Sequence, residues 1–331
     1  MRNRGKETSE LVESLATLSS PEVNQEQNLD DRLARYARAK KQALTIRNYI
    51  LEHEPNNAKI TGAMAECGSF LVFRHFYTVG ETRLFSANFC RKHLLCPLCA
   101  IARGAKVMRR YMSRYDQIRE INPKAKPYLV TFTVRDGEDL NERMNHLMDS
   151  FKSLCKRRHG ENHRSELKKA SAAVFSYEVK RGKNSGLWHP HVHCLMLCEN
   201  PINQSELSSQ WHRITKDSFI VDVRPIDTTN PIGGFLEVFK YAVKFSDQPP
   251  SDTWHAYQVL TGRRLIGSFG DFYGFIEPET LSDDLLPEDL PFIDLLFHYQ
   301  SSFYKQVSAA EKPRLLSPPD FVGSQQNISN P

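Results

Sequence analysis

Two closely spaced histidines in the second half of the chain are its most informative chemical feature. His191 and His193 flank Val192 near the start of an apolar run that extends to Cys198. In a β-strand, side chains two residues apart project from the same face of the sheet, so both imidazoles would face one way. Two neutral imidazoles on one face supply half of a divalent-metal site. The spacing therefore predicts metal binding by His191 and His193.

A carboxylate completes this site if the preceding segment forms a hairpin with the histidine strand. Residues 181–187 are rich in Gly, Asn and Ser, which favour tight turns. A turn at the centre of this stretch would pair Glu178 with His191 and place both on one face. Three ligands with open positions are what a catalytic metal requires, so we expect Glu178 as the third ligand. His189 shares the alternation but precedes Pro190, and it is the weaker candidate.

A tyrosine with ionic neighbours lies farther along the chain. Residues 233–245 have the spacing of a helix that begins at a pair of glycines. At 100° per residue, Glu237, Tyr241 and Lys244 fall within about 60° of one another, away from the apolar residues. A tyrosine at helical spacing is more often a packing residue, but ionic neighbours favour a chemical role for this one.

The chemistry that fits this trio is covalent. A free phenol has a pKa of about 10 and is a poor nucleophile at neutral pH, but Lys244 would favour the phenolate of Tyr241. With a metal polarising the phosphate, attack by the phenol would leave a phosphotyrosine that conserves the bond energy for rejoining. Glu237 could act as general base for a water or a second hydroxyl.

A group of cysteines precedes these motifs. Cys96 and Cys99 form a Cys-Pro-Leu-Cys pair with metal-ligand spacing, and Cys90 and Cys67 lie upstream. Four cysteines with one tight pair suit a tetrahedral structural Zn²⁺. The alternatives are that a nearby histidine, His93 or His75, replaces one thiolate, or that these cysteines are simply buried small residues. The other three cysteines lie in apolar patterns and are expected in the core: Cys155, Cys194 and Cys198.

Composition limits the class of protein. The chain has 331 residues, 40% of them hydrophobic, and a net charge of +5. It contains no run of about eighteen apolar residues and no apolar stretch near the N-terminus, so we expect neither a membrane span nor a secretory signal. Seven cysteines without an export signal argue against a disulfide framework and for a cytoplasmic protein.

Basic residues crowd the stretch 103–126, where they could neutralise phosphates or line a solvated helix face. They are Arg103, Lys106, Arg109, Arg110, Arg114, Arg119, Lys124 and Lys126.

The order of the expected elements favours the α+β class. Residues 127–135, 172–180, 189–198 and 219–224 have the composition of strands, and residues 141–158 carry one apolar stripe at helical spacing. The expected fold is a central antiparallel sheet of about five strands with flanking helices, plus a small Cys-rich zinc module before it.

We expect five regions along the chain. A disordered N-terminus, 1–30, precedes a helical and Cys-rich zinc-binding region, 31–125. The domain that holds the two motifs spans 126–248. A C-terminal helical region, 249–310, and a disordered tail, 311–331, follow.

These motifs resemble those of the replication initiators of rolling-circle plasmids, in the HUH endonuclease superfamily. The most similar group has a single tyrosine with a glutamate four positions before it. Residues 129–134 resemble the family's first motif strand, 189–193 its metal motif and 237–244 its tyrosine motif. The Cys-Pro-Leu-Cys pair before the first motif strand also resembles a Cys-Pro-x-Cys pair that initiators of this group have at the same place. The resemblance covers roughly residues 126–248, which it identifies as an HUH nicking domain.

The resemblance implies a function. Tyr241 would nick one strand of origin DNA, single-stranded or in a hairpin, stay attached to the 5′ phosphate and free a 3′ hydroxyl for a polymerase. Glu237 would activate water at termination, Mg²⁺ or Mn²⁺ would serve catalysis, and a host helicase is a possible partner. Some HUH transposases share the motif order, and a zinc-bearing DNA-binding regulator with an inactive site is a third hypothesis.

Overall fold

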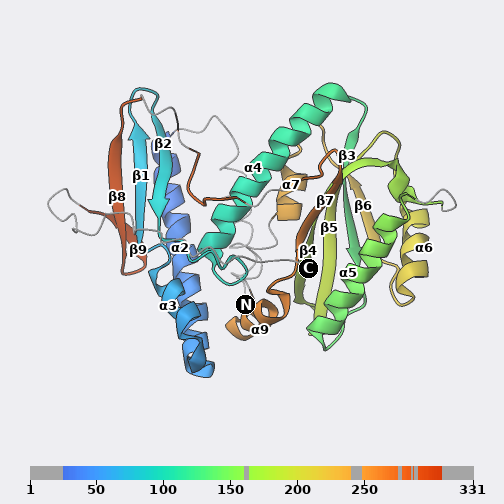
Figure 1. Ribbon diagram of the computed structural model, residues 1–331, viewed down its shortest axis with the longest axis horizontal. Helices are drawn as coiled ribbons and strands as arrows, with labels where there is room; N and C mark the ends of the chain where they lie inside the picture. The colour runs from blue at the N-terminus through green and yellow to red at the C-terminus, as the bar shows by residue number, and fades with distance from the viewer. Residues whose placement is uncertain are drawn as a thin grey trace, which may run out of the picture.

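Among the described residues, two antiparallel sheets stand on either side of a long helix, α4 (Pro97–Ile121) (Figure 1). The computed structural model describes residues 25–159, 164–239, 248–274, 278–284, 286 and 290–307. The α+β class is confirmed. Of the two segments expected to be disordered, residues 1–24 and 311–331 lie outside the described residues, whereas residues 25–30 begin a helix.

The larger sheet is the central sheet expected from the sequence. Its five strands run in the order β6-β3-β5-β4-β7, all antiparallel. The middle strand has a nearly continuous apolar sequence because both of its faces are covered, and almost all of its residues are buried. The bounds are β3 (Lys126–Thr133), β4 (Ala170–Arg181), β5 (Trp188–Cys198), β6 (Val221–Pro225) and β7 (Ile266–Gly270).

Helices cover both faces of this sheet. One face carries α5 (Leu140–Lys156) and α6 (Gln204–Thr215), preceded by the short 3-10 helix η2 (Glu166–Lys169) before β4. The apolar stripe expected on α5 is buried or half-buried, and Phe151 packs against Phe132 and Phe175 of the sheet. The helix begins where the side chain of Asp139 accepts a hydrogen bond from the backbone of Glu142 at 3.0 Å.

The other face carries α7 (Ile232–Phe239) and, behind it, α4. Ser176 of β4 donates a hydrogen bond to the carbonyl of Val238, which fixes α7 on the sheet. The ring of Phe239 stacks on Tyr111 of α4 with centroids 5.3 Å apart. The described part of α7 therefore matches the first half of the helix expected over 233–245, and residues 240–247 lie outside the described residues.

The smaller sheet is formed by two strands from the first part of the chain and two from the last part that the structure describes. Its order is β2-β1-β8-β9, with β1 (Phe70–Phe76), β2 (Glu81–Ala87), β8 (Ile293–Gln300) and β9 (Phe303–Gln306). The helices on this side are α2 (Gln25–His53) and α3 (Ala58–Glu66), joined by the 3-10 helix η1 (Pro55–Asn57). The Cys-rich region is therefore part of a larger lobe than the small module that the sequence predicted.

The prediction of a C-terminal helical region over 249–310 differs from the structure. That stretch contains one described helix, α9 (Pro250–Leu260), and three strands, β7, β8 and β9. β7 pairs with β4, so the larger sheet extends beyond the expected boundary at residue 248. β8 pairs with β1, more than two hundred residues earlier in the chain. A local sequence pattern does not reveal so distant a partner.

An ion pair ties the C-terminal segment to the smaller lobe. Arg32 of α2 donates to both carboxylate oxygens of Asp283, at 2.9 and 2.7 Å, and the backbone of Leu84 donates to the same carboxylate at 2.7 Å. Burial alone would raise the pKa of Asp283, but the Arg32 guanidinium and this backbone bond lower it below its ordinary value. The carboxylate therefore stays ionised at neutral pH.

None of the described helices has the length and apolarity to cross a membrane.

Candidate metal centres and active-site cleft

The β4–β5 hairpin brings the predicted carboxylate and histidines together. Glu178 pairs with His191 across the two strands, as the sequence predicted. The hairpin turns through residues 182–187, where Gly186 adopts a φ of +66°, a left-handed conformation that favours glycine. Because strand side chains alternate, the two histidines and Glu178 lie on the face of the sheet that α7 covers.

The polar atoms of the three side chains converge. One carboxylate oxygen of Glu178 lies 3.5 Å from Nε2 of His191 and 3.1 Å from Nε2 of His193. All three side chains are buried, and their potential ligand atoms lie within 4.8 Å of one another. Two ligands at right angles and about 2.1 Å from one ion are about 3.0 Å apart. The spacing therefore suits a divalent cation.

Hydrogen bonds to the outer nitrogens leave both Nε2 atoms available as ligands. Nδ1 of His191 lies 3.4 Å from the carbonyl oxygen of His189, which can only accept, so Nδ1 carries the proton. Nδ1 of His193 lies 3.0 Å from the hydroxyl of Thr131, which can accept in the same way. Nε2 of His193 is buried and makes no hydrogen bond among the described residues. Outer-shell bonds of this kind orient metal-binding histidines.

Burial keeps His191 neutral, the form that binds a metal. Desolvation lowers the pKa of His191 from 6.5 to about 4, although the neighbouring Glu178 acts in the opposite direction. At neutral pH its imidazole therefore carries no charge and needs to lose no proton before it binds a cation.

We expect the lowered pKa of His191 to make the metal-free protein less stable in acid. Above pH 6.5 both states of His191 are neutral, but between pH 6.5 and 4 only the unfolded chain takes up the proton, so folding loses free energy as the pH falls. The loss should reach about 2 to 3 kcal/mol between pH 7 and pH 4.5. Urea unfolding with a chelator at both pH values measures it. His191→Gln should show a smaller loss, and an unchanged loss would contradict this account.

A cleft of about 360 Å³ opens over His191 and His193. Glu237 of α7 lines this cleft together with both histidines, so the predicted general base lies at the site. Lys180 of β4 and Arg224 of β6 also line it, and neither was predicted. Arg224 pairs with Asp222, but Lys180 is exposed and forms no ion pair with a described residue. The alternation of β4 places Lys180 on the same face as Glu178, and this was the signal for it.

His189 lies at the edge of the cleft and is held by another group. Its Nδ1 lies 2.5 Å from a carboxylate oxygen of Asp136, and Ser185 donates to the other oxygen at 2.5 Å. The cluster that could hold a metal consists of Glu178, His191 and His193. This agrees with the expectation that His189 is the weaker candidate.

The remaining two predicted catalytic residues cannot be placed. Tyr241 and Lys244 lie outside the described residues. The last described residue of α7, Phe239, is buried against α4. The site is therefore described by its metal ligands, by Glu237 and by the walls of the cleft.

The four predicted cysteines form a second cluster. Sγ of Cys67 lies 3.5 Å from Sγ of both Cys96 and Cys99, and Sγ of Cys90 lies 3.6 Å from that of Cys99. Four thiolates about 2.3 Å from a tetrahedral zinc ion lie about 3.8 Å apart, so the donor set fits that ion. His75, the alternative ligand, contacts Thr82 instead.

Local structure delivers these thiols from separate elements. Cys67 ends α3, Cys90 follows β2, and Cys96 and Cys99 lie at the start of α4, whose N-terminal dipole favours a thiolate. Hydrogen bonding with Cys67 is the largest cause that holds the pKa of Cys90 far below its ordinary range and raises the pKa values of Cys96 and Cys99 well above it. In the absence of a cation, Cys90 is therefore ionised, whereas Cys96 and Cys99 retain protons that a metal would displace.

A buried cation lies beside this cluster. Nζ of Lys40 donates to the carbonyls of Met64 and Ala65, at 3.3 and 2.5 Å, and only 2% of the residue is exposed. Burial lowers the pKa of Lys40, and the nearby thiols oppose this. A positive charge here offsets the negative charge of four thiolates around one divalent ion.

A match to a known protein family spans the region that contains these sites. A family model described as "Replication protein" matches residues 81–291, which contain the Glu178 and histidine cluster and three of the four cysteines. A relative named "Protein rep" from Streptococcus pneumoniae serotype 2 is 29% identical over 181 residues, which cover 50% of this chain and 54% of the relative. The chain thus spans just over half the length of that relative.

Two further relatives named "Protein rep" match over longer spans. The one from Bacillus amyloliquefaciens is 26% identical over 260 residues, covering 65% of this chain and 72% of the relative. The one from a Bacillus species is 25% identical over 260 residues, covering 65% and 79%. No solved structure matches the chain significantly. Since the family model spans well over half of its length, the chain belongs to the Rep_1 replication protein family.

Proposed function

We propose that this chain is a plasmid rolling-circle replication initiator that nicks one strand of origin DNA and rejoins it at termination. The observation that carries the proposal is the convergence of Glu178, His191 and His193, whose two histidines line a cleft that Glu237 also lines. Membership of the replication protein family supports it. A DNA-binding regulator without catalytic activity would not require a buried cluster in which the Nε2 atoms of two histidines face the carboxylate of Glu178.

The three ligands would hold a divalent cation such as Mg²⁺ or Mn²⁺, which, when bound, polarises the scissile phosphate and stabilises charge on its non-bridging oxygens. The protein supplies the rest of the electrostatics. Lys180 and Arg224 stand on different strands that wall the cleft, where cations can neutralise neighbouring phosphates. The hydrogen bond between Thr131 and Nδ1 of His193 keeps the His193 ring in place, with Nε2 directed toward Glu178.

Tyr241 is the proposed nucleophile. Its phenol oxygen forms a bond to the phosphorus and gives up its proton, while the bond from phosphorus to the 3′ oxygen breaks. The departing oxygen takes up a proton and becomes a free 3′ hydroxyl, from which a polymerase can extend. Lys244 would favour the phenolate before the attack. The 5′ phosphate stays on Tyr241, so no bond energy is lost before rejoining.

Glu237 would act in the second half of the cycle. Its carboxylate is half-buried at the rim of the ligand cleft, where it can accept a proton from a water or from a second hydroxyl. We therefore assign to it the step that releases the protein from DNA. The cysteine cluster would hold a structural Zn²⁺ and fix the start of α4 rather than act in the reaction.

A covalent adduct tests the proposed function. The protein is incubated with Mn²⁺ and single-stranded oligonucleotides that together tile the origin region of the encoding plasmid. We expect a denaturation-resistant protein–DNA adduct, with the DNA mapped by peptide sequencing to Tyr241 and no adduct in Tyr241→Phe. Absence of an adduct on every strand would favour a DNA-binding regulator. An adduct formed only at the ends of a mobile element would favour a transposase.

Glu237→Ala is expected to separate the two steps. The first cleavage should proceed at nearly the wild-type rate, because the ligand cluster is intact, while release should slow by about a hundredfold, the typical contribution of a general base. Quenched time courses of adduct formation and decay measure both rates. Glu142→Ala, which removes an exposed acid on α5, serves as the control. Equal rates of decay in wild type and Glu237→Ala would refute the assigned role.

A further inference from the structure

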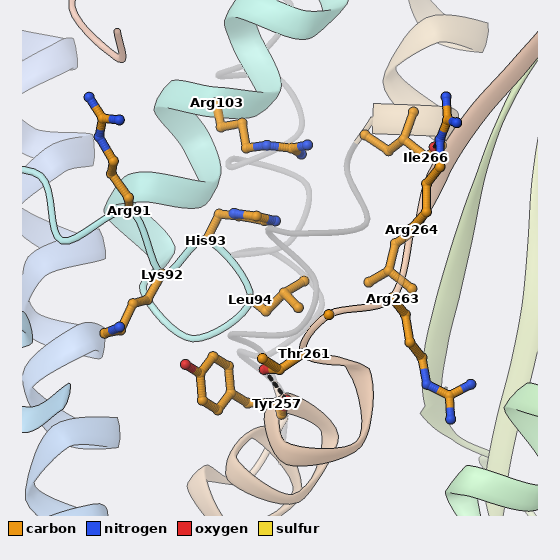
Figure 2. Close-up of a pocket in the computed structure, with 12 residues that line it drawn as sticks. Arg91, Lys92, His93, Leu94, Arg103, Tyr257, Thr261, Arg263, Arg264 and Ile266 are labelled. Carbon is orange, nitrogen blue, oxygen red and sulfur yellow. Dashed lines mark hydrogen bonds between the residues drawn. The ribbon is translucent and has the colours of Figure 1, made fainter. Parts of the chain in front are cut away.

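A second cleft, of about 560 Å³, lies between the two lobes (Figure 2). One wall is formed by the loop between Cys90 and α4 together with α4 itself, and the other by the segment from α9 to β7. Among the described residues, no acid lines the cleft. Six of its lining residues are basic or can become so: Arg91, Lys92, His93, Arg103, Arg263 and Arg264. Its lining is therefore suited to an anion.

Part of this positive charge is not neutralised by the described protein. Lys92 and Arg264 form no ion pair with a described acid, and Arg91 donates only to the carbonyl of Glu279, at 2.9 Å. Arg263 does not add to the positive charge inside the cleft. Its guanidinium donates to Asn141 and Asn145 of α5 and points away from the cleft (Figure 2).

The positive charge continues beyond the cleft along the seam between α4 and β7. Burial raises the pKa of the Tyr111 phenol, and Ser268 and the nearby charges of Arg114 of α4 and Arg264 act in the opposite direction. Arg114 also forms no ion pair with a described acid. By contrast, Lys106 and Arg109 on the same helix face Asp284 and Asp283, at 3.1 and 3.8 Å. Arg114 thus differs from Lys106 and Arg109 on the same helix, which both face described acids.

This cleft is connected to the metal ligands through one pair of strands. Ile266, at the end of the wall segment, pairs with Ser176 of β4, and the backbone of Tyr177 donates to the carbonyl of Leu265 at 2.9 Å. The next residue of β4 is Glu178, a ligand of the candidate catalytic metal. Arg103 of α4 lines the inter-lobe cleft and Glu237 of α7 lines the metal cleft, and these two helices pack against each other over the same face of the sheet. A strand of DNA could therefore follow this face from one cleft to the other.

The cleft also offers an aromatic ring. Tyr257 of α9 is half-buried in the lining and stacks on Trp254 with centroids 5.5 Å apart. Cations that follow a backbone, combined with an aromatic side chain on which a base can stack, are typical of single-strand binding. A volume of about 560 Å³ exceeds the needs of one phosphate ion.

We propose that this inter-lobe cleft binds the sugar-phosphate backbone of single-stranded DNA that leads into the metal cleft. The inference rests on the proposed function only in that the strand is the one cleaved. The cations of the cleft neutralise phosphates, and Tyr257 stacks on a base. The cleft thus extends the substrate site beyond the scissile phosphate.

A double variant tests the cleft. Lys92→Ala with Arg264→Ala removes two cations that lack ionic partners, and Lys59→Ala with Lys152→Ala removes two exposed cations from α3 and α5 as a charge-matched control. The probes are a long single strand centred on the cleavage site and a short strand that spans only that site. Binding is measured by fluorescence anisotropy over a range of salt concentrations, and adduct formation is followed on both strands.

We expect the cleft variant to bind the long strand about tenfold more weakly at near-physiological salt, with a salt slope smaller by about 1.4, because each lost phosphate contact removes about 0.7 from the slope for a single strand. The short strand should form the adduct at the wild-type rate. Equal losses on both strands, an equal loss in the control, or a loss confined to duplex DNA would overturn the proposal. If wild type forms no adduct at all, the proposed function fails, but the binding comparison still decides the cleft.

Discussion

His193→Ala is expected to abolish Mn²⁺-dependent strand cleavage. The substitution removes a ligand whose buried Nε2 lies 3.1 Å from Glu178 and leaves that carboxylate with one imidazole. Loss of about 4 kcal/mol of transition-state stabilisation corresponds to a rate about a thousandfold lower. Mn²⁺ affinity, measured by electron paramagnetic resonance, should fall together with the cleavage rate, and circular dichroism should show that the fold is retained.

His189→Ala is the matched control. It removes an imidazole from the same strand and the same cleft, but this ring is held by Asp136 and is not part of the ligand cluster. We expect Mn²⁺ affinity to stay within about threefold of wild type, since outer contacts cost less than ligands. The opposite result, with affinity lost in His189→Ala and kept in His193→Ala, would show that the ligand set is wrong.

Cys99→Ser is expected to have the largest effect on stability. Cys99 is fully buried in the first turn of α4, and its Sγ contacts those of Cys67 and Cys90. Binding of structural zinc contributes on the order of 10 kcal/mol to folding, comparable to the whole stability of a domain. Loss of one thiolate should therefore release the ion and unfold the smaller lobe at room temperature.

Metal content and folding can be read separately. Zinc is quantified by mass spectrometry of the purified protein, with about one ion per chain expected in wild type and almost none in Cys99→Ser. Near-ultraviolet circular dichroism reports the loss of packing around the aromatic residues of the lobe. Cys155→Ser is the control, because Cys155 is half-buried on α5 outside the cluster. A wild-type protein without zinc would contradict the assignment.

The sequence predicted the parts of the site that depend on local pattern. Period-two alternation placed both histidines on one face, and the turn residues set the register that opposes Glu178 to His191. The tight pair Cys96 and Cys99 indicated the cysteine cluster. Its other members are brought in by α3 and by the end of β2, so their approach depends on tertiary structure.

Features that depend on distant pairing were not predictable. Lys180 and Arg224 reach the metal cleft because β4 and β6 lie in the same sheet, with two other strands between them. The inter-lobe cleft joins residues near 91, which lie between two of the cysteines, to residues near 264, which carry no motif. The basic stretch 103–126 was recognised, but the burial of Arg103 and Lys106 was not, since it comes from packing on segments far along the chain.

Pairing of β8 with β1 determines when this protein can finish folding during translation. All five strands of the larger sheet have left the ribosome once residue 270 has emerged, whereas β1 must wait for residues 293–300 before both of its edges are covered. A premature stop after residue 290 would leave β1 with an open edge, which can pair with other chains. The cysteine lobe is therefore the first to be synthesised and the last to be completed, because the larger sheet is inserted between its first two strands and its last two.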